Sequence, residues 1–123
     1  MNINLAALYY QYRNSTDEGA AMELFKKKFP PTVDMAVEKI LVDLSHRDRT
    51  KIANMDESDL TIFHQSYGIF IKNEFRLWGN TPLLNSCCEI SGRKSVNPDQ
   101  ASFIILKELQ RRIQKTNVLK VVK

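Results

Sequence analysis

The sequence predicts an all-α protein, a small bundle of five to seven helices around a central apolar helix at about residues 57–78, with no sheet. Two observations lead to this expectation. Apolar residues recur at the three- and four-residue spacing of helices along the chain, and the short turn sequences that join strands in hairpins are missing. Four glycines and four prolines are few for 123 residues, which favours helices joined by short loops.

Length and composition indicate one compact domain. A chain of 123 residues, 43% of them hydrophobic, can bury a core of its own. Pro30-Pro31 separates an N-terminal helical arm, residues 1–30, from a helical core domain, residues 31–116, and a basic tail follows at 117–123. We expect the arm and the core to pack as one unit.

The net charge and the two cysteines limit the classes of protein to which this chain can belong. A net charge of +4 permits a nucleic-acid partner but does not indicate one. No run approaches the roughly 18 apolar residues of a membrane span, and the N-terminus lacks the basic start of a signal peptide. Cys87 and Cys88 are adjacent, a spacing that suits neither a disulfide framework nor a metal site. We therefore expect a cytoplasmic protein with no membrane association, metal or cofactor.

Two helices are predicted in the arm. Residues 2–13 carry three tyrosines, Tyr9, Tyr10 and Tyr12, which pack on the central helix or form a contact surface for a partner. A second helix follows Ser15-Thr16-Asp17 and ends before Pro30-Pro31.

The core begins with the clearest amphipathic pattern in the chain. Thr32 is the expected N-cap of a helix whose buried side follows the i, i+3, i+4, i+7 pattern from Val33 to Leu44. Ser45, with Asp48 three residues later, starts a short and mostly polar helix that runs to about Asn54.

The predicted central helix starts at Asp56, with Asp59 completing a capping box, and is stopped by Gly79-Asn80. It is apolar on more than one side, so we expect other helices to cover it on several sides. Gly68 inside it suggests a close approach by the first or last helix. We expect Trp78 to anchor its end in the core, whereas an exposed Trp78 would indicate a binding hot spot.

Two further helices complete the prediction. Thr81-Pro82 provides a cap and a proline in the first turn of a short helix through Cys87. A polar loop at 89–97 leads to Asn97-Pro98-Asp99-Gln100, a strong start for the last helix.

The core also resembles a family of small bacterial domains of unknown function. The resemblance covers about residues 31–114, and its signature matches His64, Gly68, Ile71-Lys72-Asn73, Leu77-Trp78, Pro98, Asp99 and Ser102. Lys72 stands where the family pattern has arginine, so a forked clamp on an anion is not available there. The resemblance implies an all-helical domain and supplies no activity.

The polar residues with most potential for chemistry are His64, Asn73, Arg76, Asp99 and Ser102. A His–Asp pair across two helices could act as a general base. We favour a structural role, in which a buried neutral His64 is hydrogen-bonded to Asp99 or Ser102 of the last helix. There is no glycine-rich phosphate loop, HExxH sequence or nucleophile elbow, so no catalytic residue is assigned.

Three functions follow, in order of preference. The first is a non-enzymatic protein-interaction or regulatory module. The second is a small enzyme or ligand-binding domain centred on His64. The third is nucleic-acid binding through the last helix, with possible anion contacts at Lys72, Arg111, Arg112 and Lys115.

Overall fold

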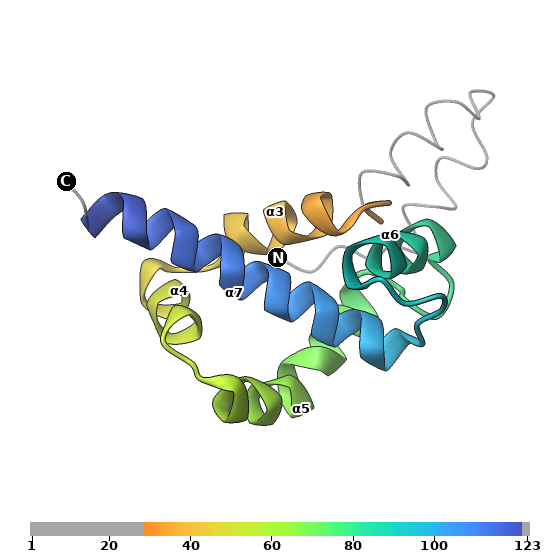
Figure 1. Ribbon diagram of the computed structural model, residues 1–123, viewed down its shortest axis with the longest axis horizontal. Helices are drawn as coiled ribbons and strands as arrows, with labels where there is room; N and C mark the ends of the chain where they lie inside the picture. Colours follow the sequence, from red (N-terminus) through yellow and green to blue (C-terminus); the bar gives the residue numbers. More distant parts are fainter. Residues whose placement is uncertain (1–28, 122–123) are drawn as a thin grey trace, which may run out of the picture.

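The computed structural model describes residues 29–121, with their side chains up to residue 116 (Figure 1). This part contains five helices and no strand, which confirms the all-α prediction. They are α3 (Val33–Asp43), α4 (His46–Ala53), α5 (Glu57–Glu74), α6 (Thr81–Ser91) and α7 (Pro98–Val121). The helices expected in the N-terminal arm, with Tyr9, Tyr10 and Tyr12, lie in residues 1–28, outside the described residues, except for Phe29, which is not helical.

Four of the helices begin where local capping chemistry predicts. The side chains of Thr32 and Ser45 accept hydrogen bonds from backbone N–H groups three residues later. Asp56 with Asp59, and Asn97 with Gln100, form reciprocal capping boxes. These contacts satisfy N–H groups that have no partner within the helix itself.

The cap of α6 is Asn80 and not Thr81 as predicted. Asn80 Oδ1 accepts from Leu83 N at 3.3 Å, while its Nδ2 donates to the backbone oxygens of Pro30 and Phe75. Asn80 is buried and joins three segments, which a threonine hydroxyl could not do.

The central helix of the bundle is α7, not the predicted helix at 57–78. In Figure 1 α7 crosses the molecule, and α3, α4, α5 and α6 each pack against it. By contrast α5 makes its main contact with α7 alone, and within it only Leu60, Gly68 and Ile71 are buried. The expectation that other helices cover α5 on several sides is therefore wrong for the part of the chain described.

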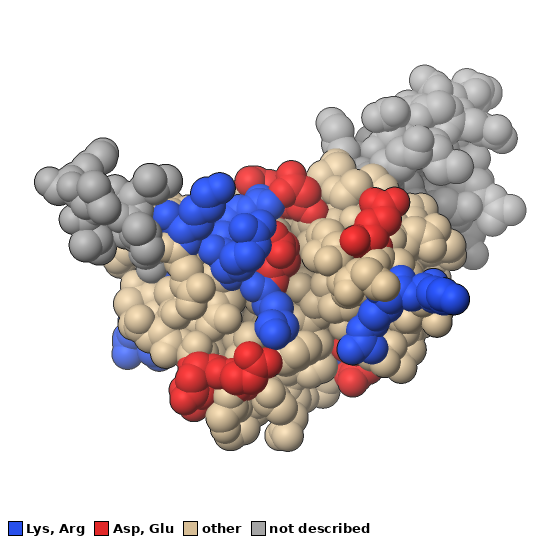
Figure 2. Space-filling view, in the orientation of Figure 1, with Lys and Arg blue, Asp and Glu red and all other residues tan. Residues whose placement is uncertain are grey.

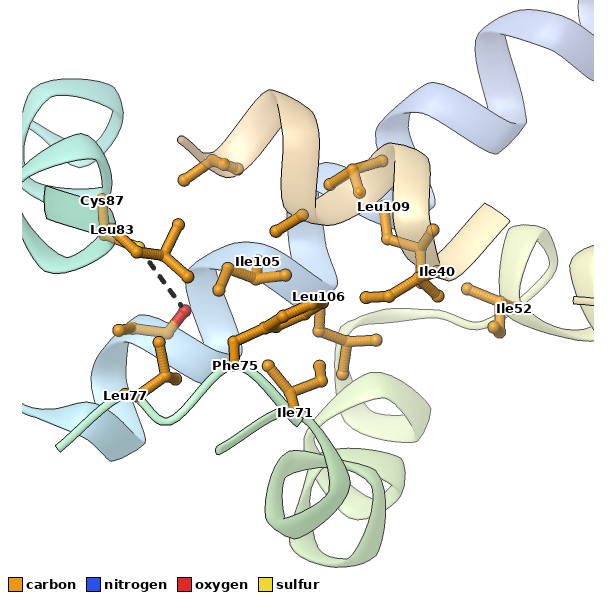
Figure 3. Packing of buried hydrophobic residues seen from close by; sticks show 14 of the residues in the cluster. Ile40, Ile52, Ile71, Phe75, Leu77, Leu83, Cys87, Ile105, Leu106 and Leu109 are labelled. Carbon is orange, nitrogen blue, oxygen red and sulfur yellow. Dashed lines mark hydrogen bonds between the residues drawn. The ribbon is translucent and has the colours of Figure 1, made fainter. Parts of the chain in front are cut away.

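The core forms where these helices meet α7. Figure 3 shows side chains from all five helices, and from the turn after α5, converging on Ile105, Leu106 and Leu109. Cys87 lies in this core, where its Sγ contacts the Ala101 carbonyl at 3.8 Å and burial raises the pKa of the thiol to about 12. Cys87 therefore behaves as a small apolar core residue.

The end of α5 explains where Trp78 lies. The helix ends at Glu74, four residues before the predicted end, and Arg76 adopts a left-handed conformation with φ of 52°. Leu77 N then donates to the Lys72 carbonyl at 3.1 Å, the hydrogen bond of a Schellman-type helix end. This turn buries Leu77 fully and leaves Trp78 59% exposed, so the prediction of a buried Trp78 is wrong.

Candidate functional site

His64 of α5 and Ser102 of α7 meet where the two helices cross. His64 Nε2 lies 2.7 Å from Ser102 Oγ. Ser102 is fully buried and the His64 ring is half-buried. The prediction that His64 bonds to Asp99 or Ser102 of the last helix is confirmed, with Ser102 as the partner.

The neighbours of Ser102 fix the position of the protons. Ser102 Oγ lies 2.7 Å from the backbone oxygen of Asp99, and two oxygens at that distance require a hydrogen between them. The single hydroxyl proton therefore points to Asp99, and Ser102 accepts a hydrogen bond from His64 Nε2–H. With a proton on Nε2, His64 is not placed to remove a proton from Ser102, so the pair lacks the arrangement of an activated nucleophile.

The surroundings of His64 favour its neutral form. Burial is the main cause that lowers the pKa of His64 below 6.5, and the ammonium of Lys72 acts in the same direction. The Asp99 carboxylate opposes this effect, but it forms an ion pair with Lys72 at 3.1 Å. The edge-to-face contact of His64 with Phe103, with ring centroids 5.0 Å apart, adds an apolar neighbour.

Gly68 provides the room for the His64 ring. A Cβ at position 68 would lie 2.7 Å from His64 Nε2 and 2.8 Å from Cδ2, far inside van der Waals contact. The nearest atoms thus belong to a side chain one turn earlier in α5, and not to the first or last helix as expected. The glycine allows the imidazole to lie along the helix and reach Ser102.

Asn73 and Arg76 are not part of this arrangement. Asn73 follows His64 by nine residues, which places it about 180° around the helix on the exposed side. The Arg76 guanidinium lies over the Phe29 ring, 5.9 Å from its centroid. The five predicted polar residues therefore form no single site.

The predicted anion contacts on the last helix are largely occupied by carboxylates. Arg111 pairs with Glu108, and Arg112 pairs with Asp34 and Glu38 of α3. Lys115 is exposed. Figure 2 accordingly shows basic side chains over the second half of α7 with acidic side chains beside them. Paired cations attract phosphate less than free ones do, because the neighbouring carboxylates cancel their field.

The most distinctive surface is one that sequence reasoning assigned to the core. Ile62, Ile69 and Phe70 of α5 are 62%, 54% and 44% exposed. They lie on the side of the helix turned away from α7. Phe63 and Tyr67 lie at the edge of this side, half-buried against the core, and we call these five residues the outer face of α5. Ser66 and Asn73 lie on the same side, so no charge interrupts it between residues 62 and 73, while Asp59 and Glu74 lie at its two ends. The signal in the sequence that could have identified this surface is the set of apolar and uncharged residues on a second side of the helix.

An aromatic ladder forms one edge of this face. The rings of Phe63 and Tyr67 stack with centroids 4.8 Å apart, and the Phe70 ring follows at 5.1 Å from Tyr67. Burial, followed by the carboxylates of Asp43, Asp48 and Glu74, raises the pKa of Tyr67 to about 12.

Among the described residues, no cluster of three or more His, Cys, Asp or Glu side chains is arranged to hold a metal ion. None of the helices in this same part of the chain is both long and apolar enough to cross a membrane.

Comparison with known proteins gives a family but no activity. A family model described as a domain of unknown function (DUF6794) matches residues 29–113, close to the span of the resemblance described above. No curated protein and no solved structure shows significant similarity to the chain.

Proposed function

The chain belongs to the DUF6794 family, a domain of unknown function, and we propose that it is a non-enzymatic protein-interaction module that binds its partner through the outer face of α5. The observation that carries this proposal is the exposure of Ile62, Ile69 and Phe70 together on one side of α5 that has no charged residue between positions 62 and 73.

Single exposed apolar residues are normal on protein surfaces, but a contiguous apolar side is not. Interface centres are depleted in charged residues and enriched in aromatic ones, and the outer face of α5 has both properties. Each large apolar side chain that a partner covers there contributes roughly 1.5–3 kcal/mol when burial is complete. A helix with such a side fits the helix-in-groove mode of recognition, in which residues spaced by one or two turns act as anchors.

Trp78 supports the same proposal. It is more than half exposed, although tryptophan is the residue type most enriched at the energetic centres of interfaces. Its exposure results from a left-handed turn at Arg76, a conformation that costs a non-glycine residue roughly 1–2 kcal/mol. The same turn buries Leu77 in the core and leaves the Trp78 indole available to a partner.

The two alternative functions have less support. An enzyme that used His64 to activate Ser102 as a nucleophile lacks support, because the Ser102 hydroxyl donates to the Asp99 backbone oxygen and accepts from His64 Nε2–H. Nucleic-acid binding through α7 would need unpaired cations, whereas Arg111 and Arg112 pair with carboxylates.

The test is site-specific photo-crosslinking in cells of the native host. A photoreactive residue at Ile69 should capture a partner that the same residue at Val42 does not. Val42 is a suitable control because it is apolar and 80% exposed, but lies on α3. With the captured partner purified, Ile69→Asp should weaken binding at least about tenfold, which is about 1.4 kcal/mol, and Val42→Asp should not. Equal weakening by both substitutions, or by neither, would contradict the proposal.

A further inference from the structure

The large side chains of the outer face of α5 are placed symmetrically about Ser66. Ile62 and Phe63 precede Ser66 by four and three residues. Ile69 and Phe70 follow it by three and four residues. Each half of the face therefore carries one isoleucine and one phenylalanine at the same distances from the centre. Three of these four side chains are exposed, and the fourth, Phe63, is half-buried.

Ser66 suits the centre of a close helix crossing. Its side chain is small and exposed, and Ser66 Oγ donates a hydrogen bond to the Phe63 backbone oxygen at 3.2 Å. The hydroxyl therefore keeps its hydrogen bond when another surface covers it, so its burial carries little penalty. The axes of two packed helices can approach to about 8 Å where the side chains at the contact are small.

A two-fold interface requires a surface that is complementary to itself, because both protomers contribute the same patch. Rotation about a two-fold axis beside Ser66 places Ile62 of one protomer opposite Phe70 of its partner. The same rotation places Phe63 opposite Ile69, so that large apolar side chains meet on both sides of the crossing. We therefore propose that the partner of the outer face of α5 is a second copy of this chain, with the two α5 helices antiparallel and crossing at Ser66. This inference rests on the proposed function, because it names the partner that this face binds.

The ends of the face favour the antiparallel arrangement over a parallel one. Asp59 precedes Ser66 by seven residues, and Asn73 follows it by seven. An antiparallel pair brings the Asp59 carboxylate of one protomer near the Asn73 amide of its partner, which can donate to it. A parallel pair would instead place the two Asp59 carboxylates against each other, and like charges repel. Asp59 and Glu74 lie outside the apolar pairs, at the rim, where charged residues stay hydrated.

The first experiment is sedimentation equilibrium of the full chain. One pair of crossing helices forms a small interface, below the roughly 1,200 Å² of most stable complexes, so we expect a reversible dimer of micromolar affinity. Between about 1 and about 500 μM, a range that brackets such an affinity, the mass should rise from that of the monomer toward twice that value. Ile69→Asp should raise the dissociation constant at least about tenfold, and Val42→Asp on α3 should leave it unchanged. A chain that stays monomeric, or equal effects of the two substitutions, would overturn the inference.

Disulfide crosslinking tests the position of the two-fold axis. In a Cys88→Ser background, in which the remaining Cys87 is buried, Ser66→Cys should form a covalent dimer under mild oxidation. The residue at the axis meets its own copy, which brings the two Cα atoms within the roughly 4.4–6.8 Å that a disulfide requires. Val42→Cys in the same background is the control, because Val42 is 80% exposed but lies on α3. If Ser66→Cys crosslinks no faster than Val42→Cys, the helices do not cross at Ser66.

A mixing experiment tests the direction of the two helices. Asp59→Cys and Asn73→Cys, each in the Cys88→Ser background, should form a disulfide between the two variants when they are mixed. Neither variant should crosslink efficiently by itself, because each position faces the other one in an antiparallel pair. Crosslinking of Asp59→Cys with its own copy, but not with Asn73→Cys, would show a parallel pair and contradict the proposed arrangement.

The two proposals can fail separately. If photo-crosslinking at Ile69 captures a different protein and the free chain stays monomeric, the outer face of α5 is an interface, but the inference of a second copy fails. If the chain dimerises and Ile69→Asp has no effect on the dimer, the dimer uses another surface and the inference also fails. If no partner captured at Ile69, including a second copy, is weakened more by Ile69→Asp than by Val42→Asp, the proposed function fails as well.

Discussion

Substitution of Gly68 by alanine tests the geometry around His64. In most helices this change increases stability by about 1 kcal/mol, because alanine has the higher helix propensity. Here the new Cβ would lie 2.7 Å from His64 Nε2, the atom that bonds to Ser102. The ring must move, so we expect the substitution to be destabilising.

The expected size follows from the contacts that the ring makes. Displacing His64 loses one hydrogen bond, worth about 0.5–1.5 kcal/mol, and the edge contact with Phe103, worth about as much. Set against the gain in helix propensity, Gly68→Ala should lower the free energy of unfolding by about 1 kcal/mol. In a His64→Ala background the clash is absent, and the same substitution should raise it by about 1 kcal/mol.

This reversal of sign can be measured by urea unfolding of the wild type, the two single variants and the double variant. The free energies of unfolding should give a coupling of about 2 kcal/mol between positions 64 and 68. Gly79→Ala is the control, because a Cβ there would meet only the Arg76 oxygen at 4.0 Å, and its effect should stay within about 0.5 kcal/mol. If Gly68→Ala stabilises both backgrounds equally, the His64 ring does not lie over Gly68 and the reasoning is refuted.

Three further predictions concern single side chains. Because the pKa of His64 is held below 6.5 in the folded protein, the unfolded chain binds a proton at His64 more readily. The free energy of unfolding should therefore fall as the pH drops from 6.5 through the lowered pKa. The variant His64→Gln should remove this fall, and the control variant His46→Gln should retain it. Asn97→Ala should cost about 1 kcal/mol in thermal unfolding, because the α7 capping box is lost, while Asn85→Ala within α6 should be close to neutral. Trp78→Ala should change stability by less than about 1 kcal/mol, and the fluorescence of this single tryptophan should be that of a solvent-exposed indole; a blue-shifted emission with a loss of several kcal/mol would show that the side chain is buried.

The helix starts could be predicted because capping is local. Thr32, Ser45, Asp56 and Asn97 each bond to a residue three positions later, so the information lies within four residues. The predicted cap of α6 was one residue too late, because Asn80 bonds to the backbone oxygens of Pro30 and Phe75 as well as to its own helix. Contacts of that kind become visible only once the fold is known.

The identity of the central helix could not be predicted from apolar content. The last helix carries many charged residues, whereas the segment at 57–78 is more apolar. In the structure these long side chains reach out to neighbouring helices, as Lys107 does to Glu57 and Arg112 does to Asp34 and Glu38. A helix can therefore be surrounded by others and still be charged, since its ion pairs lie at the margins of the contacts.

The polar pair was predictable in part. His64 lies at the edge of the apolar stripe, which suits a ring that is partly buried and makes one polar contact. Asp99 and Ser102 of the last helix were both candidates, and the structure shows Ser102 as the partner. The exposure of Trp78 was not predictable, because it depends on a left-handed conformation at Arg76, a residue type that rarely adopts it.

The hydrogen bond between His64 and Ser102 also affects which side of α5 faces the solvent. The helix has two apolar sides about 180° apart, one with Leu60 and Ile71 and the other with Ile62 and Ile69, so burial alone discriminates weakly between them. Turning α5 over would carry His64 away from α7 and leave the buried hydroxyl of Ser102 without its donor. It would also place Asn73, which has no such partner, against α7. The hydrogen bond, worth about 1 kcal/mol, and the cost of burying Asn73 therefore both favour burial of the side with Leu60 and Ile71 over the side with Ile62 and Ile69.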